Sequence, residues 1–409
     1  MTRRIALAVA VLTTAAALGV GTSWALFTGS TSASTTLSSA LLAAPTSLTA
    51  TGTPTASLSW TATTSSWATG TRVFRANASG GPYSQIAQIS PRTTTSYSDA
   101  GCGGTCFYVV EAYYTGNGAN WTSVNSNEAQ NAPLVSTATV AKTTGYSAGR
   151  VHQGGTYYLY AQAADDAGVS SVTADVHNLT AGQTAVALTA GAYSVGGASY
   201  NYRSGSLTVD NPKAAGTYSF TVTAKNVGNT SITTTWSVVV DNTAPTASSP
   251  FVQTANKAGG TAGKLEAGDA ITFLYTEAMD PASIYAGWDG STTNVVVRVN
   301  YNGGLLNNLV VYDATNTTVL NVTSALGVGL GSGAWVTANA TFGASGTAST
   351  MTMSGSQVMV TLGTASAGVS STALGATQFS WTTSSGATDQ AGNACAQNAF
   401  TQPAAVVNF

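Results

Sequence analysis

Charged side chains are the scarcest component of this sequence. Only 7% of the 409 residues are Asp, Glu, Lys or Arg, against about 25% in an ordinary globular protein. Thirteen basic and fifteen acidic residues give a net charge of −2. Because binding to a phosphate backbone needs a clustered basic surface, we predict that the chain does not bind nucleic acid.

Histidine and cysteine are also rare, with two and three residues. This scarcity leaves little room for a zinc or haem site. Apolar residues, by contrast, make up 44% of the chain, which is enough to form buried cores and argues against disorder throughout. At about 150 residues per domain, the length predicts two or three domains.

The N-terminus has the pattern of an export signal. Arg3 and Arg4 precede an apolar run, and small residues stand at Ser23 and Ala25. The run is shorter than the ~20 residues that span a bilayer, which favours a secretory signal peptide over a retained membrane helix. We predict a signal peptide over 1–25, cleaved after Ala25. The protein would then be secreted or on the cell surface, with no membrane span after cleavage.

A Ser/Thr-rich leader, 26–44, follows the predicted cleavage site. The stretch Trp24–Thr28 leads into it, and Leu42–Pro45 closes it. This stretch resembles the export region of the TasA/camelysin-type secreted proteins of Gram-positive bacteria. The resemblance is confined to this segment, so it implies an export route and carries no fold with it.

Beyond residue 44 the sequence indicates short β-strands. Runs rich in Thr, Val, Tyr and Trp alternate with clusters of Gly, Asn, Asp and Ser, which is typical of β-sandwiches. No stretch has a sustained helical period. We therefore predict an all-β fold of tandem β-sandwiches.

Residues 45–131 resemble a fibronectin type III domain. The first three strands of that family match Pro45–Ala50, Leu58–Trp60 and Gly70–Ala76. The resemblance implies a sandwich with Trp60 in its core.

Two cysteines four residues apart, Cys102 and Cys106, occupy the corner where that family often has a Leu and a Tyr. In an exported protein such a pair would oxidise. We predict a disulfide in place of the usual tyrosine hydrogen bond; the competing interpretation is a redox or metal pair. Cys395 is left over, and an odd cysteine either pairs between chains or is buried and inert. We favour the buried state.

Residues 134–241 resemble a bacterial immunoglobulin-like domain, through the strands Thr156–Ala161 and Gly216–Ala224. Pro245 follows and cannot continue a strand ladder, so it marks a boundary. The stretches Leu265–Phe273, Thr276–Ile284 and Asp389–Ala394 match a larger Ig-like module of surface-layer and adhesin proteins, which residues 246–409 therefore resemble. The match is loose over 285–350, where Gly-rich stretches indicate an insertion or long hairpins.

We identify no catalytic residues. The four glutamates are expected to have structural roles, and neither histidine lies in a nucleophile motif. An enzyme hidden in 285–350 would have only Asp289 and Asp313 for acid–base chemistry. The residues weighed and set aside are Glu111, Glu128, Glu266, Glu277, His152 and His177.

Calcium is the one ion for which the sequence has candidate ligands. Asp165, Asp166 and Asp241 fall where Ig-like modules often meet, and calcium prefers carboxylate and carbonyl oxygens. None of them forms a calcium-loop motif. The alternative is that Asp165 and Asp166 cap a turn, and we predict no other metal or cofactor.

Tyrosines are dense in the second module, which suggests sugar stacking. In a strand, Tyr158 and Tyr160 share one face and Tyr157 shares the other with Leu159. One face must be core, so only half of these rings are available. The second dense pair is Tyr200 and Tyr202.

These observations predict a non-enzymatic, secreted or cell-surface protein that acts as a structural or adhesive array. Its partner would be a cell-wall, matrix or host-surface polymer, and self-association is an open alternative. A second hypothesis is an accessory carbohydrate-binding protein of a secreted polysaccharide-degrading system.

Overall fold

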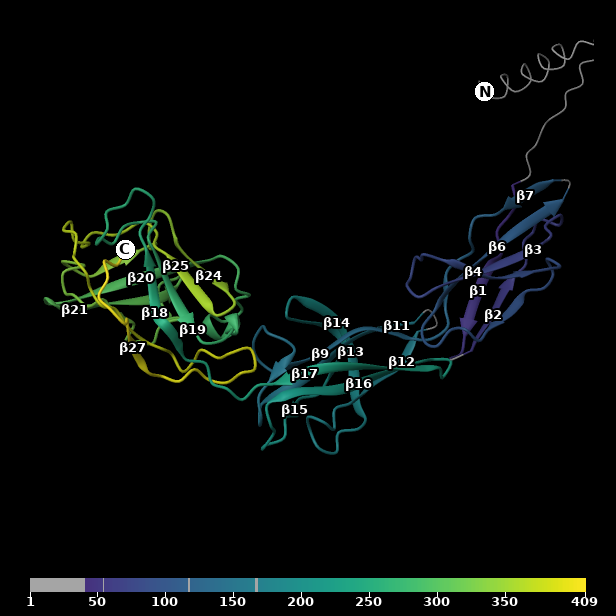
Figure 1. The fold of residues 1–409 in the computed structure, drawn as a ribbon, viewed down its shortest axis with the longest axis horizontal. Coiled ribbons are helices and arrows are strands. Elements are labelled where there is room, and N and C mark those ends of the chain that lie inside the picture. The colour runs from purple at the N-terminus through teal and green to yellow at the C-terminus, as the bar shows by residue number, and fades with distance from the viewer. Residues whose placement is uncertain (1–40, 54, 117, 166–167) are drawn as a thin grey trace, which may run out of the picture. The chain divides into compact units, whose positions relative to one another are not determined.

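The computed structural model describes four stretches of the chain: 41–53, 55–116, 118–165 and 168–409. The predicted signal peptide, its cleavage site at Ala25 and nearly all of the leader lie outside the described residues, as does Asp166. Figure 1 shows strands throughout the described chain. No helix in these stretches is long and apolar enough to cross a membrane.

Strand pairing divides the described residues into three groups. Every pairing stays within 46–130, within 134–240 or within 247–406. Each group also has its own buried cluster of apolar side chains. We call the groups the first, second and third modules.

The first module is a sandwich of two antiparallel sheets. A three-stranded sheet has the order β1-β2-β5, and a five-stranded sheet has the order β4-β3-β6-β7 with β8 also paired to β6. Leu58, Trp60, Val73 and Val110 form part of the core between them, and Trp60 has the buried position expected. The strands are β1 (Thr46–Thr51), β2 (Ala56–Thr61), β3 (Gly70–Ala76), β4 (Ser84–Ile89), β5 (Ser96–Asp99), β6 (Phe107–Gly116), β7 (Ala119–Thr122) and β8 (Ala129–Gln130).

The loop between β5 and β6 contains the predicted disulfide, which joins Cys102 and Cys106. A tyrosine hydrogen bond is present as well. The Tyr108 hydroxyl donates to Asp99 Oδ2 at 3.0 Å, and Arg75 forms an ion pair with the same oxygen at 2.9 Å. The disulfide is therefore present together with a tyrosine hydrogen bond and does not replace it. The two can coexist because Tyr108 is a separate residue, two positions after Cys106.

The second module is built on one nine-stranded sheet. Its order is β10-β17-β16-β12-β13-β14-β11-β15, with β9 also paired to β11. Leu159, Val172, Phe220 and Val222 lie in the enclosed core. The strands are β9 (Leu134–Lys142), β10 (Arg150–Val151), β11 (Thr156–Ala164), β12 (Val169–Asp175), β13 (Val186–Val195), β14 (Ala198–Ser204), β15 (Leu207–Thr208), β16 (Gly216–Asn226) and β17 (Ser231–Val240).

The third module has a ten-stranded sheet in the order β18-β19-β25-β24-β20-β21-β22-β26-β27, with β23 paired to β20. The loosely matched region, 285–350, supplies the long hairpin of β20 and β21 near the middle of this sheet. It belongs to the core of the module. The elements are β18 (Ala247–Ala255), β19 (Ala270–Tyr275), α2 (Pro281–Ile284), β20 (Thr293–Asn302), β21 (Leu305–Asp313), β22 (Val328–Gly329), β23 (Ala340–Phe342), β24 (Ser349–Ser354), β25 (Gln357–Thr361), β26 (Ser380–Thr382) and β27 (Ala399–Thr401).

Candidate functional site: the junction of the second and third modules

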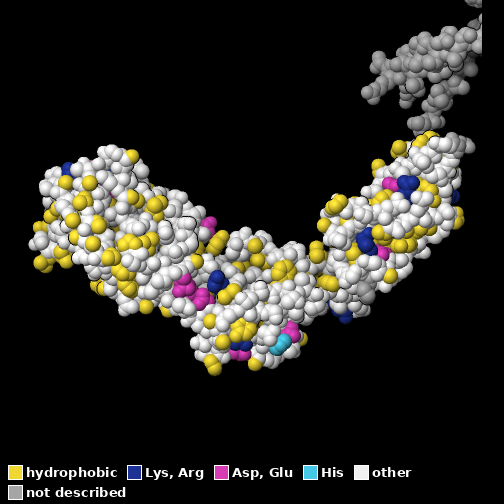
Figure 2. Space-filling model, viewed as in Figure 1, with side chains coloured by type: hydrophobic (Ala, Val, Ile, Leu, Met, Phe, Trp, Pro, Cys, Tyr) yellow, Lys and Arg dark blue, Asp and Glu magenta, His cyan; other side chains and the backbone are white. Residues whose placement is uncertain are grey.

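Charged side chains are sparse on the face seen in Figure 2. Six charged residues, some of them buried, nevertheless lie together where the second module contacts the third. Three belong to the second module, at the end of β9, in β10 and directly after β17. Three belong to the third, in the turn after β19 and in the loop after β26. They are Lys142, Arg150, Asp241, Glu277, Asp280 and Asp389.

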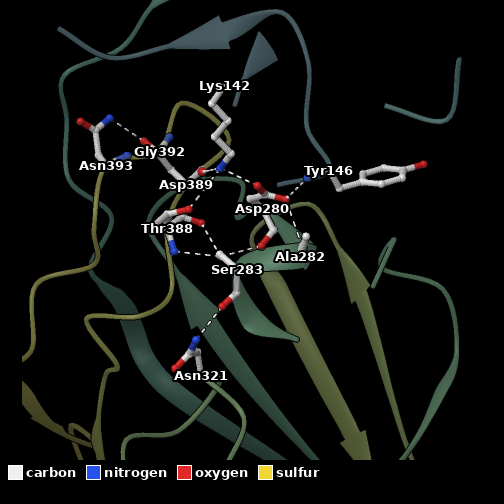
Figure 3. A network of polar contacts seen from close by, with 10 residues as sticks. All are labelled: Lys142, Tyr146, Asp280, Ala282, Ser283, Asn321, Thr388, Asp389, Gly392 and Asn393. Atoms are coloured by element: carbon white, nitrogen blue, oxygen red, sulfur yellow. Dashed lines mark hydrogen bonds and ion pairs between the residues drawn. The ribbon is translucent and has the colours of Figure 1, made fainter. Parts of the chain in front are cut away.

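A buried ion pair connects the two modules (Figure 3). Lys142 Nζ contacts Asp280 Oδ2, and their side chains are 11% and 0% exposed. The ammonium also donates to Thr388 Oγ1 at 3.2 Å and to the Asp389 carbonyl at 3.1 Å. Among the described residues, Lys142 is the only polar partner of Asp280 Oδ2. A cation from the second module thus neutralises a carboxylate buried in the third.

The other oxygen of Asp280 fixes the local backbone. Asp280 is the N-cap of α2, and its Oδ1 accepts from the Ala282 amide at 3.2 Å. This is the usual role of Asp before a helix that begins with Pro. The same oxygen accepts from the Tyr146 amide at 3.0 Å, so the capping carboxylate also contacts the second module's backbone.

Ser283 holds the opposite loop against α2. Its hydroxyl oxygen accepts from the Thr388 amide at 2.9 Å, and the hydroxyl lies 2.7 Å from the Asp280 carbonyl to which it donates. Asn321 Nδ2 donates to the Ser283 carbonyl at 2.8 Å. These bonds position the loop whose next residue is Asp389.

Beside the ion pair lies an acidic trio, formed by Asp241, Glu277 and Asp389. One carboxylate oxygen from each residue lies within 4.8 Å of the other two. Arg150 is the nearby cation, 3.5 Å from Asp241 Oδ2. Together these residues line a cavity of about 210 Å³.

Asp389 is the most buried member of the trio, at 1% exposure. Its Oδ1 accepts from the amides of Gly392 and Asn393 at 2.6 and 2.8 Å, and its Oδ2 accepts from Asn393 Nδ2 at 2.8 Å. Asn393 Nδ2 also donates to the Asp241 carbonyl at 2.8 Å. A single amide group therefore joins the two modules and orients one carboxylate of the trio.

The pKa of Glu277 is shifted by its position in the acidic trio. Burial, followed by repulsion from Asp389 and Asp241, raises the pKa of Glu277 from 4.5 to about 7, against the opposing effect of Arg150. A carboxyl group with this pKa changes charge near neutral pH. The cavity is smaller than the ~300–1,000 Å³ of typical small-molecule sites, so it fits an ion or water better than an organic substrate.

Three carboxylates in this geometry could hold a divalent cation such as calcium, which takes six to eight oxygen ligands at roughly 2.3–2.6 Å. Of the calcium candidates from the sequence, only Asp241 is in this group. Asp165 lies elsewhere, where its Oδ2 accepts from Asn226 Nδ2 at 3.3 Å. Calcium binding stays a prediction, to be tested by unfolding with calcium and with a chelator.

Sequence reasoning missed the trio and the ion pair. Glu277 was expected to occupy a structural turn. Asp280 and Asp389 lie in stretches that carry the Ig-like resemblance, but no role was predicted for them or for Lys142. The only local signals were an Asp before a Pro and the Asp-Gln-Ala-Gly-Asn stretch at 389–393. Neither indicates a partner so distant in sequence.

The remaining candidates have structural contacts. Glu111 pairs with Arg72, and Glu128 accepts from the Gly80 amide at 2.8 Å. The Glu266 carboxylate accepts from the Thr261 amide at 2.7 Å. The two other acids, Asp289 and Asp313, accept hydrogen bonds within their own turns.

The histidines have local polar contacts, and the third cysteine is buried. His152 Nδ1 contacts the Gln153 carbonyl at 2.8 Å, and His177 Nδ1 contacts Asp175 at 2.6 Å. Cys395 is buried, as favoured from the sequence.

The tyrosines of the second module pack mainly against each other. Tyr157 and Leu159 are fully buried in the core, as the alternation predicts. On the other face, Tyr160 and Tyr200 are also buried, and the Arg203 guanidinium lies 4.3 and 4.5 Å from two ring centroids, those of Tyr158 and Tyr193. The dense rings therefore cover their own sheet and leave little stacking surface.

No protein-family model matches the chain, and no curated protein matches it. Several solved structures are similar. A Fn3-like protein from Clostridium thermocellum is 37% identical over 22% of this chain and 93% of its own, with a TM-score of 0.19. The FN1–FN3 domains of chicken CNTN1 are 9% identical, covering 80% and 100% of the two chains, with a TM-score of 0.26. A tetra-tandem repeat in the extending region of a large adhesion protein is 16% identical, covering 84% and 82%, with a TM-score of 0.16.

The class of the protein follows from its own sheets. The chain is an all-β protein over the described residues, as the strand patterns predict, and its first module has the two-sheet sandwich that the fibronectin type III resemblance implies. The TasA/camelysin resemblance and the export signal stay predictions, because their residues lie outside those described.

Proposed function

We propose that this protein is a non-enzymatic, secreted or cell-surface array of β-sandwiches with a structural or adhesive role. The observation that carries the proposal is the buried ion pair of Lys142 and Asp280, which joins two modules with separate cores. Modules that act only as independent spacers do not need a buried ion pair between them. Modules that must stay together under load are stabilised by one.

The chemistry of the junction agrees with this role. The carboxylates of the acidic trio have an arginine, a lysine and an asparagine as neighbours, and we identify no activated Ser or Cys nucleophile beside them. Their cavity is too small for a polymer chain. What they can do is couple two modules through charge.

Cell fractionation and force spectroscopy test this proposal together. We expect the protein in the wall fraction or the medium, and we expect the mature chain to unfold under load in separate steps, one for each module. A single unfolding step would contradict the array. A hydrolase activity that is lost in Glu277→Gln would contradict the non-enzymatic role.

A second candidate function is that of an accessory carbohydrate-binding protein. One observation favours it, an exposed group of aromatic rings in the first module. Retention of the whole chain on insoluble glycans separates this candidate from a purely structural role.

A further inference from the structure

Three aromatic rings meet at one end of the first module. Trp67 lies in the loop before β3, Tyr114 lies in β6, and Trp121 lies in β7. Their centroids are 5.5 Å apart for Trp67 and Tyr114, 5.6 Å for Trp67 and Trp121, and 5.6 Å for Tyr114 and Trp121. We call this group the aromatic platform.

Tyr114 of the platform lies on the core-facing side of its sheet, beyond the end of the main core. Side chains alternate along a strand, so Tyr114 shares a face of β6 with the core residues Tyr108 and Val110. Trp121 is the cross-strand partner of Tyr114. Leu42 is buried against Tyr114 and Trp67 in a small separate cluster, while Trp121 remains 53% exposed.

Two neighbouring rings hold Trp121 in place. The Tyr114 ring is tilted 35° from the Trp121 plane, and the Trp67 ring stands at 90° to it. Both are favourable aromatic geometries. Strand β7 is an edge strand among the described residues, and the Trp121 side chain is 53% exposed there. A ring fixed before binding loses little entropy when a ligand stacks on it.

The segments that carry the platform have polar but no charged residues of their own. The segments 61–69 and 112–124, which carry the three rings, contain no Asp, Glu, Lys, Arg or His. Exposed hydroxyl and amide side chains flank the rings in sequence, at Ser66, Asn120 and Thr122. Two arginines contact these segments: Arg92 donates to the Thr63 carbonyl at 3.3 Å, and the Arg72 guanidinium lies 5.1 Å from the ring centroid of Tyr113.

We propose that the aromatic platform is a stacking site for a neutral polysaccharide. One face of a pyranose ring presents C–H groups, which pack on an indole face, while its hydroxyls pair with uncharged donors and acceptors at the rim. Single-stranded nucleic acid also stacks on aromatic rings, but it needs a positively charged groove. Arg92 and Arg72 do not form one, because Arg72 is already paired with Glu111. The inference rests on the proposed adhesive function, and it places the contact with the polysaccharide in the first module.

The test measures retention of the whole mature chain on insoluble cellulose, xylan, chitin and mixed-linkage β-glucan. We expect binding to at least one of them, weakened at least tenfold by Trp121→Ala and less by Trp121→Phe. Val124→Ala is the matched control, because Val124 is 78% exposed and close in sequence but outside the platform. Tryptophan fluorescence should also change on titration with soluble oligosaccharides of the retained glycan, and not in Trp121→Ala.

The outcomes separate this inference from the proposed function. Equal retention of the wild type and Trp121→Ala overturns the platform, as does retention on none of the four glycans, and both leave the array intact. Concentration-dependent self-association that Trp121→Ala abolishes, without glycan binding, would assign the platform to a second copy of the chain and also overturn the inference. Single-step unfolding under load would contradict the array whatever the glycan result.

Discussion

At the scale of single residues, Lys142 is the side chain on which the junction most depends. Among the described residues, it supplies the only counter-charge to a fully buried carboxylate oxygen, Asp280 Oδ2. Removing one partner of a buried ion pair costs about 3–5 kcal/mol when the site cannot open to water. The junction can respond by opening, so this range is an upper bound on the effect.

We therefore predict that Lys142→Ala lowers the free energy of unfolding of the third module by up to about 3–5 kcal/mol. Asp280→Asn should cost less, because Lys142 keeps its bonds to Thr388 and Asp389 and the amide oxygen can still accept from Tyr146. Urea denaturation measures both. Lys257→Ala is the control, since its partner Glu266 is 3.8 Å away and both are partly exposed. An equal, small effect of all three substitutions would contradict the prediction.

The second prediction concerns how the stability of the protein depends on pH through Glu277. Its folded pKa of about 7 is above the 4.5 of an ordinary Glu, so the folded state binds more protons than the unfolded state between these values. Stability must then fall as pH rises from about 4.5 to about 7 and level off above it. Glu277→Gln should remove this part of the pH profile and be the more stable protein at pH 8.

Thermal unfolding at pH 5, 6, 7 and 8 checks this expectation. Glu266→Gln is the control, because its carboxylate lies outside the acidic trio. If the profile of Glu277→Gln has the same slope as the wild type between pH 5 and 7, another group causes the dependence.

At the scale of elements, the sequence predicted the first three strands of the first module well and the junction poorly. Alternation and the Leu58–Trp60 motif depend on neighbouring residues, so they can be read from the chain. The acidic trio brings together the residue after β17, the turn after β19 and a loop near Cys395. Such a site exists only after the sheets have packed, and no local pattern encodes it.

The loop between β5 and β6 gives a third prediction. The Cys102–Cys106 disulfide closes a loop of four residues' separation, so its loss should cost less than the ~3 kcal/mol of a 15-residue loop. The Tyr108–Asp99 hydrogen bond remains to hold the same corner. Cys102→Ser/Cys106→Ser should therefore fold with a modest decrease in the urea midpoint.

Thiol labelling completes this test. The unreduced wild type should have one reactive thiol after denaturation, that of the buried Cys395, and none while folded. Added reductant should destabilise the wild type but leave the double variant unchanged. Three labelled thiols without reductant would contradict the disulfide.

At the scale of the whole molecule, the boundaries between modules near Pro133 and near Pro245 are not equivalent, although each is marked by a proline in the sequence. Asn131, Ala132 and Pro133 are all buried. The Asn131 side chain accepts from the Cys106 amide at 2.7 Å and donates to the Gly52 carbonyl at 2.8 Å. The first boundary is thus bound to the first module. At the second boundary, Thr243 and Ala244 are exposed.

Limited proteolysis should show this difference. A protease needs an exposed backbone that can adopt an extended form, so we predict that a broad-specificity protease cuts first next to Thr243 and Ala244. The products would be one fragment with the first two modules and one with the third. Lys142→Ala should speed this cut, because the open junction frees the linker, whereas Lys257→Ala should not. First cleavage at 131–135 would mean that the buried contacts of Asn131 do not protect the first boundary, and equal rates in the two lysine variants would mean that the ion pair does not hold the junction closed.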